Sequence, residues 1–103
     1  MYSIDFTSEA MRDLEKLDGS VRERILEKIK WFKESFENVI PLSLGGKWRG
    51  FFKLRVGDWR IVYNVDLGKN IITIHRIDHR TRVYKRKNKN PASAELPYQS
   101  KAR

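Results

Sequence analysis

Alternation of apolar and polar side chains dominates the middle of the chain. Between residues 52 and 63, every second position is apolar on each side of the pair Gly57-Asp58. Such alternation is typical of half-buried β-strands, and a Gly-Asp pair between two of them predicts a two-residue hairpin loop. The loop sets the register of the antiparallel pair, which we expect to be Val56 with Trp59, Arg55 with Arg60, Leu54 with Ile61 and Lys53 with Val62.

This register divides the side chains of the hairpin between two faces. One face is expected to cover a core, because it carries Phe52, Leu54, Val56, Trp59, Ile61 and Tyr63. The other face carries Lys53, Arg55 and Arg60. Like charges that lie directly opposite each other on a sheet cost stability, so the pairing of Arg55 with Arg60 indicates an anionic partner. Phosphate is the partner that this chemistry favours.

The first third of the chain has the periodicity of a strand followed by two helices. Residues 2–6 alternate as a short strand, and helices are expected over residues 8–17 and 20–36. Thr7 is predicted to cap the first helix, with Phe6 and Met11 as a hydrophobic staple, and Ser20 is predicted to open the second with a capping box. An apolar stripe on the second helix should pack on the first helix and on the sheet: Val21, Ile25, Ile29, Phe32 and Phe36.

The remainder of the chain adds one long strand and a basic tail. Pro41 and Gly45-Gly46 mark a loop before the hairpin, and the β-branched residues 71–77 predict a third long strand. This order predicts an α+β domain (β-α-α-β-β-β) over residues 1–85, with the N-terminal strand and a two-helix hairpin packed on one face of an antiparallel sheet. The opposite face is left for function, and residues 86–103 are expected to form a flexible basic tail.

Composition narrows the class of protein. The 103 residues suffice for one small domain, and the lack of cysteine excludes disulfides and a cysteine nucleophile. No leader-like segment opens the chain and no apolar run reaches membrane-spanning length, so we expect a cytoplasmic protein without a membrane partner. The net charge of +9 is segregated: residues 1–46 hold 7 Lys and Arg against 9 Asp and Glu, whereas residues 47–84 hold 9 against 3. The basic half predicts binding to a polyanion.

The sequence lacks the usual motifs of metal and cofactor chemistry. No phosphate-binding Gly-rich loop precedes a helix, and His75 and His79, which should share a face of the last strand, make a weak metal site on their own. We therefore expect neither a metal nor a cofactor. RNA supplies its own nucleophile, because its 2′-hydroxyl can attack the adjacent phosphate when a protein aligns it and accepts its proton.

A metal-free site for this reaction needs a base and several cations. Lys53 is the candidate base, because the neighbouring Arg55 and Arg60 disfavour its protonated form while both arginines stay charged. Tyr84 is suited to stacking on a base or to orienting a proton. His79 is suited to donating a proton, although a structural hydrogen bond explains it equally well.

Two segments resemble the RelE/ParE superfamily of bacterial and archaeal toxins, on its RelE side. They are residues 53–63 (KLRVGDWRIVY) and residues 79–84 (HRTRVY), and the resemblance extends over residues 2–85. It implies a RelE-like fold and a ribosome-dependent endoribonuclease, or mRNA interferase, which cuts mRNA in the ribosomal A site and leaves a 2′,3′-cyclic phosphate. It also implies a cognate antitoxin that inhibits the toxin, through an amphipathic helix.

The resemblance further implies roles for individual residues. By position, Lys53 resembles the general base, Arg60 and Arg55 the ligands of the phosphate and its transition state, Arg80 the group at the leaving oxygen, and Tyr84 the base-stacking residue. Because arginine is a poor proton donor, charge stabilisation is the role expected for Arg80. Further contacts with the RNA are expected from His79, Lys47, Arg49 and Arg82.

Departures from the family pattern leave alternatives open. Phe51 stands where some RelE toxins carry a second lysine, and Asp78 and Arg82 replace residues that are commonly glycine and acidic. A ParE-like toxin would poison DNA gyrase by binding on the same scaffold, although such relatives generally lack the full cationic set. A plain RNA-binding module would explain the charge, but not the Arg and Tyr residues at the end of the last strand.

Overall fold

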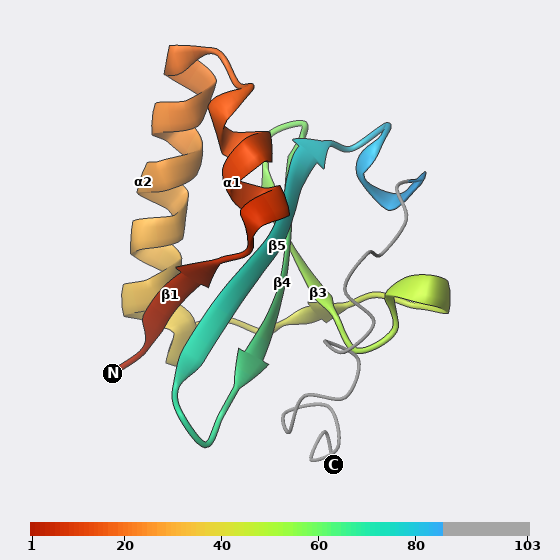
Figure 1. The fold of residues 1–103 in the computed structure, drawn as a ribbon. Coiled ribbons are helices and arrows are strands. Elements are labelled where there is room, and N and C mark those ends of the chain that lie inside the picture. Colours follow the sequence, from red (N-terminus) through yellow and green to blue (C-terminus); the bar gives the residue numbers. More distant parts are fainter. Residues whose placement is uncertain (86–103) are drawn as a thin grey trace.

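Two helices pack on one face of a five-stranded sheet in the computed structural model, which describes residues 1–85 (Figure 1). Within this range the strands are β1 (Ser3–Phe6), β2 (Leu42–Ser43), β3 (Phe52–Val56), β4 (Trp59–Asp66) and β5 (Ile71–His79). The helices are α1 (Ser8–Glu15) and α2 (Gly19–Ser35), and short 3₁₀ turns follow as η1 (Phe36–Asn38), η2 (Gly46–Trp48) and η3 (Val83–Lys85). The tail predicted over residues 86–103 lies outside the described residues.

The predicted α+β architecture is confirmed, with one difference in the sheet. The strand order is β1-β5-β4-β3-β2, and β1 runs parallel to β5, from the pair of Ser3 with Ile71 to the pair of Phe6 with Ile74. The sheet is therefore mixed rather than antiparallel. Parallel neighbours need a long crossover connection, which the helices and the hairpin supply here. The short strand β2, which was not predicted, adds an antiparallel edge beside β3.

The hairpin of β3 and β4 has the predicted register. Arg55 lies opposite Arg60 and Lys53 opposite Val62, and the other two pairs also match. Gly57 occupies the first position of the loop with φ 59°, a conformation that glycine adopts without the steric cost that other residues incur. The alternation of side chains along the sequence therefore predicted the two faces of the hairpin correctly.

The first helix begins as predicted. Oγ1 of Thr7 accepts a hydrogen bond from the amide of Ala10 at 3.1 Å, which satisfies one of the free N–H groups of the first turn. The Thr7 hydroxyl also lies 3.3 Å from the carbonyl oxygen of His75, so the same side chain joins α1 to β5. Met11, predicted as part of a staple, is 41% exposed and lies outside the core.

The second helix begins differently from the prediction. It starts at Gly19, and no side chain caps its first turn, so the capping box predicted at Ser20 is wrong. Instead, Arg22 reaches back to the end of α1 and donates hydrogen bonds to the carbonyl oxygens of Leu14 and Leu17, at 3.1 and 2.7 Å. These bonds satisfy carbonyls that the end of α1 leaves free, and they fix the corner between the two helices.

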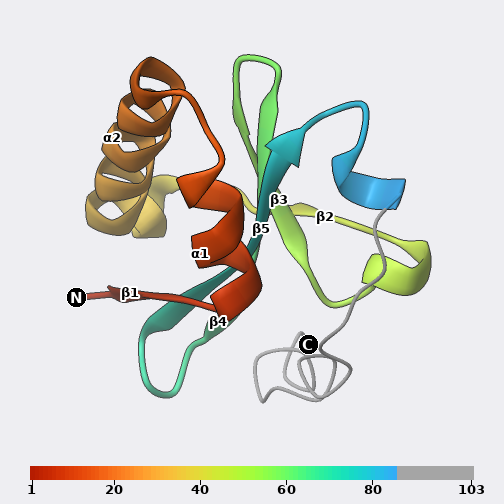
Figure 2. The same cartoon turned by 45° about the horizontal axis from the view of Figure 1, so that its top comes forward.

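The main core lies between the helices and the sheet. Figure 2 shows both helices on the same side of the sheet. The predicted apolar stripe supplies Ile25, Ile29 and Phe32 from α2 and Phe36 from η1. These side chains are buried in one core with Leu54, Ile61, Tyr63, Ile72 and Ile74 of the strands. Aromatic rings meet edge to face in this core, with the centroids of Phe32 and Tyr63 4.8 Å apart. No helix among residues 1–85 is long and apolar enough to cross a membrane.

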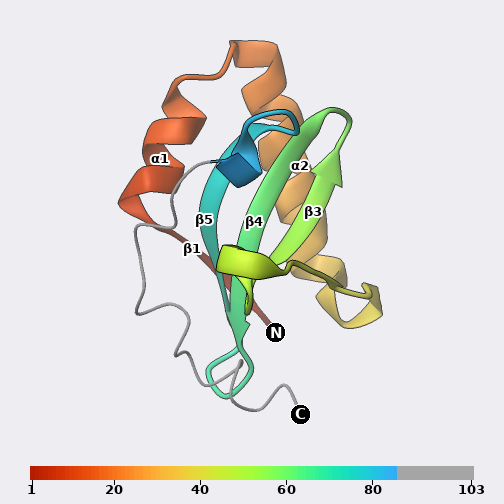
Figure 3. The same ribbon diagram turned by 90° about the vertical axis from the view of Figure 1, so that its right-hand side faces the viewer.

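A second, smaller apolar cluster lies on the other face of the sheet. It consists of the buried residues Trp48, Phe51, Val62 and Val83, with Leu44 and Tyr84 packed against it. The turns η2 and η3, yellow-green and blue in Figure 3, lie over the strands on the side away from α2. The face that was expected to be left free is therefore partly covered, and the cover brings residues 83–85 next to β4.

Candidate functional site

Three cations lie on the same side of the hairpin as the second apolar cluster. Arg55 and Arg60 are directly opposite each other, and Lys53 is opposite Val62, a member of that cluster. Directly opposed residues on one face have β-carbons about 5 Å apart, so the three side chains are neighbours. We call Lys53, Arg55 and Arg60 the cationic face. None of the three forms an ion pair with a carboxylate within residues 1–85.

Tyr84 is brought to the cationic face by η3. Val83 is completely buried against the sheet, and this anchor packs the neighbouring ring of Tyr84 on the second cluster. Burial raises the pKa of the Tyr84 phenol, while the charges of Arg60 and Arg55 and a weak hydrogen-bonding contact with Arg60 act in the opposite direction. Both arginines are therefore close to the phenol. The hydroxyl is buried and has no hydrogen-bond partner of good geometry among the described residues.

Arg80 and Arg60 both contact the turn of the hairpin. The amide of Arg80 donates to the carbonyl oxygen of Asp58 at 2.8 Å, and its Nε lies 3.3 Å from the Asp58 carboxylate. Nη1 of Arg60 donates to the carbonyl oxygen of Gly57 at 2.8 Å and to that of Trp59 at 2.9 Å. Two cations from separate elements therefore contact the same turn of the hairpin.

Arg82, the second arginine of the closing motif, folds back on the end of β5. Its Nη2 and Nε lie 3.1 and 3.3 Å from the same carboxylate oxygen of Asp78, which also accepts a hydrogen bond from the amide of His79. The Arg82 side chain is exposed. Its charge is thus balanced by Asp78, the residue that also lies directly opposite Arg60 in the sheet.

His79 lies apart from these cations. It is opposite Trp59, whose ring packs on the main core, and the two rings meet edge to face at 5.5 Å. Nδ1 of His79 contacts the hydroxyl of Thr81 at 2.9 Å and accepts a hydrogen bond from the Thr81 amide. The side chain therefore faces the helix side of the sheet, so the structure does not bring His79 together with Arg60.

The two histidines do not share a face, and the prediction that they would was wrong. β5 carries one extra residue, His75, between the pair of Val62 with Arg76 and the pair of Tyr63 with Ile74. Such a bulge shifts the alternation by one position and reverses the faces beyond it. His75 is buried, with its ring 4.9 Å from that of Phe51 and its Nε2 3.1 Å from Oδ1 of Asn64. Burial lowers its pKa to about 4.

Phe51 is a structural residue of the second cluster. It is completely buried, and its ring meets that of Trp48 edge to face at 5.3 Å. Lys47 and Arg49, the exposed neighbours of Trp48, lie at the start of β3, whereas the turn that holds Arg60 and Arg80 lies at its end. The structure thus separates Lys47 and Arg49 from Arg80. No group of three or more His, Cys, Asp or Glu side chains that could hold a metal occurs within residues 1–85.

Comparison with known proteins places this geometry in a family. Residues 4–84 match the family model described as the ParE toxin of the type II toxin-antitoxin system, parDE. The chain belongs to the RelE/ParE superfamily of toxins. Its sequence is 35% identical to Toxin RelG of Mycobacterium tuberculosis over 89 residues, which cover 82% of this chain and 98% of the relative.

Solved structures show the same fold for this toxin. The RelBE2 toxin-antitoxin complex from Mycobacterium tuberculosis matches with a TM-score of 0.68 at 29% identity, covering 76% of this chain and 96% of the matched chain. The isolated RelE toxin from E. coli matches with a TM-score of 0.65 at 25% identity, covering 82% and 93% of the two chains. The fold is therefore that of RelE toxins.

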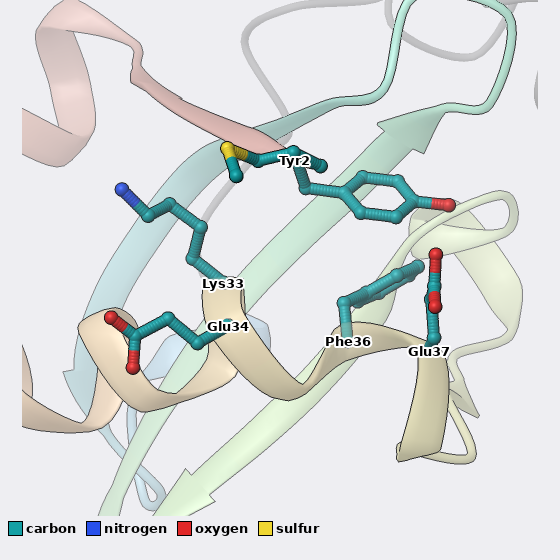
Figure 4. Close-up of a pocket in the computed structure, with 6 residues that line it drawn as sticks. Tyr2, Lys33, Glu34, Phe36 and Glu37 are labelled. Atoms are coloured by element: carbon teal, nitrogen blue, oxygen red, sulfur yellow. The ribbon is translucent and has the colours of Figure 1, made fainter.

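The toxin has a second surface feature, a pocket on the helix side of the sheet. This pocket of about 460 Å³ lies where the start of β1 meets the end of α2, and its lining residues are Met1, Tyr2, Lys33, Glu34, Phe36 and Glu37. Figure 4 shows the rings of Tyr2 and Phe36 side by side, with the carboxylate of Glu37 beside them. The lining is mixed, with one cation and two carboxylates. It offers no positive site for phosphate.

Proposed function

We propose that this type II toxin is an endoribonuclease that cleaves mRNA on the ribosome by attack of a 2′-hydroxyl on the adjacent phosphate. One observation carries the proposal: Lys53, Arg55 and Arg60 share one face of the hairpin, and Tyr84 packs beside them. Arg80 adjoins this face at the turn. A base, several fixed cations and a stacking ring are the groups that this reaction needs.

Each group has a role that fits its position. Lys53, in its neutral form, accepts the proton of the 2′-hydroxyl as that oxygen attacks phosphorus. Arg60 and Arg55 stabilise the charge on the phosphorane, because guanidinium groups bind phosphate oxygens well and stay protonated. Arg80 stabilises the departing 5′ oxygen, which takes a proton from water, and Tyr84 stacks on a base. The products are a 2′,3′-cyclic phosphate and a free 5′-hydroxyl.

The proposal includes two partners. The site is small and open, so we infer that the ribosome completes it by holding mRNA in the A site, which places the toxin in the cytoplasm. We also infer a cognate antitoxin that inhibits the toxin through an amphipathic helix, since a structure at 29% identity is of a toxin-antitoxin complex. In this view the antitoxin prevents the toxin from reaching ribosomes.

A translating extract tests the nuclease directly. The purified toxin is added to a programmed reporter, and cleavage is mapped with and without engaged ribosomes. Lys53→Ala and Arg80→Ala should each lower the rate by about 100-fold or more, because each removes a group that acts on charge in the transition state. Lys30→Ala, which removes an exposed charge from α2, is the matched control and should cleave at the wild-type rate.

Two results would contradict this proposal. Equal cleavage of naked and ribosome-bound mRNA would show that the ribosome is not required for cleavage. Full activity of Lys53→Ala would show that Lys53 is not the general base. Thermal melts of the variants would show that they remain folded.

A gyrase-binding toxin is the second candidate, because the family model that matches residues 4–84 is named for ParE. It predicts gyrase-dependent DNA breaks while the message stays intact. A plain RNA-binding module predicts neither breaks nor cleavage.

A further inference from the structure

The turn of the hairpin carries one carboxylate among three arginines. Arg60 donates to the carbonyl of Gly57, and Arg80 contacts both the main chain and the side chain of Asp58. Arg24 of α2 also reaches the turn, since a β-carbon placed on Gly57 would lie 2.8 Å from its Nη2. Asp58 is thus the one negative side chain of the turn itself, while Asp78 lies opposite Arg60 on β5.

The Asp58 carboxylate is not needed to place Arg80. The main-chain bond from the Arg80 amide to the Asp58 carbonyl, at 2.8 Å, already ties the two segments together. The side-chain contact is a single one at 3.3 Å between largely exposed groups, 58% and 68% exposed for Arg80 and Asp58. Exposed ion pairs of this kind contribute little to stability. The carboxylate therefore acts mainly on the charge of Arg80.

Asp78 differs from Asp58 because its carboxylate has a structural role. Its side chain is only 16% exposed, it pairs with Arg82, and it accepts the His79 amide at 2.7 Å. Removing that carboxylate would leave a half-buried amide without its partner. The Asp58 carboxylate accepts no hydrogen bond from a main-chain amide of residues 1–85, so its charge can be removed without disturbing the fold.

We propose that Asp58 is a specificity-determining residue, which competes with RNA phosphate for Arg80 and so weakens the binding of RNA away from the ribosome. This inference rests on the proposed function. Carboxylates and phosphates bind a guanidinium through the same charge-assisted hydrogen bonds, so one can replace the other. A ribosome presents many phosphates around the site and displaces the carboxylate, whereas a short free RNA has few contacts with which to do so.

The test measures binding alone. A single-stranded RNA oligonucleotide with 2′-O-methyl groups throughout cannot be cleaved, so fluorescence anisotropy reports affinity whether or not the toxin is a nuclease. Asp58→Asn should bind this RNA about fivefold more tightly than the wild type at low salt, the scale expected for an exposed charge pair. Asp5→Asn on the edge strand β1, which β5 separates from β4, makes the same change in net charge and should bind like the wild type.

A double-mutant cycle separates competition for Arg80 from a general effect of charge. In an Arg80→Ala background, Asp58→Asn should no longer change the affinity, because the contested guanidinium is gone. The inference is overturned by a gain that persists without Arg80, by an Asp58→Asn variant that binds no more tightly than Asp5→Asn, or by no measurable binding of Asp58→Asn at low salt. If the cycle behaves as expected but the extract shows no cleavage, the proposed nuclease fails while Asp58 keeps its role in RNA binding.

Discussion

Tyr84 is a residue whose ring and hydroxyl have separable roles. Its ring packs on the second apolar cluster, while its buried hydroxyl lacks a hydrogen-bond partner of good geometry among residues 1–85. Burial raises its pKa, so the phenol stays protonated at neutral pH and cannot serve as a base. The separation predicts different outcomes for removing the hydroxyl and removing the ring.

We expect Tyr84→Phe to cleave mRNA within about threefold of the wild-type rate, because the lost hydroxyl makes no strong hydrogen bond. Tyr84→Ala should lose about 10-fold to 100-fold, the range that stacking of one base on an aromatic ring supplies. Single-turnover cleavage on programmed ribosomes measures both. Equal loss in the two variants would instead assign Tyr84 a role in proton transfer.

Single residues of the candidate site differ in how far the sequence predicts them. The alternation around Gly57-Asp58 places Lys53, Arg55 and Arg60 on one face, because a two-residue loop fixes the register. The burial of Phe51 could not be foreseen from that alternation. It depends on a cluster formed with Val62 and Val83, which only the folded chain brings together.

The bulge in β5 is a feature of a whole strand that the sequence pattern does not predict. The β-branched composition of residues 71–77 predicts the strand, but composition does not reveal that one extra residue shifts its faces at His75. Two hydrogen bonds with α1 and its cap fix the backbone here. The Thr7 hydroxyl donates to the carbonyl oxygen of His75, and the Ile77 amide donates to the Asp13 carboxylate. Such long-range contacts leave no periodic signal in the sequence.

Burial of His75 in this bulge predicts a dependence of stability on pH. Its pKa is about 4 in the folded toxin and 6.5 in an exposed histidine, so the unfolded chain binds a proton that the folded chain does not between these values. The free energy of unfolding should therefore fall as the pH drops from 6.5 towards 4, by about 3 kcal/mol in total. Urea denaturation across this range measures the fall.

His75→Gln tests the assignment, because glutamine can donate to Asn64 without titrating. The variant should lose most of the slope between pH 6.5 and 4, whereas His79→Gln, at a half-buried position, should retain it. Glu9, whose pKa is lowered, contributes loss of stability only at more acid pH, below its ordinary value of 4.5. A slope unchanged in His75→Gln would assign the pH dependence to other groups.

The whole molecule divides its charge between its two sides. Residues 1–46, which supply the helices, hold more acidic than basic side chains, while residues 47–84 hold 9 Lys and Arg against 3 Asp and Glu. This division could be counted from the sequence, but its direction in space comes from the fold. The helices cover one face of the sheet, and the cationic face points to the other. A polyanion is therefore attracted more strongly to the side where Tyr84 and Arg80 lie than to the side of the helices.

Location rather than net charge should then decide how tightly the toxin binds ribosomes. The double variant Lys53→Ala with Arg55→Ala removes two charges from the cationic face, and Lys30→Ala with Lys33→Ala removes two exposed charges from α2. Cosedimentation with ribosomes at increasing salt compares the two at equal net charge. The first variant should bind about tenfold more weakly and dissociate at lower salt, because each lost phosphate contact reduces the counterions that binding releases. The second should follow the wild type; equal weakening of both would show that the toxin is attracted by its total charge and that the sheet face has no special part in binding.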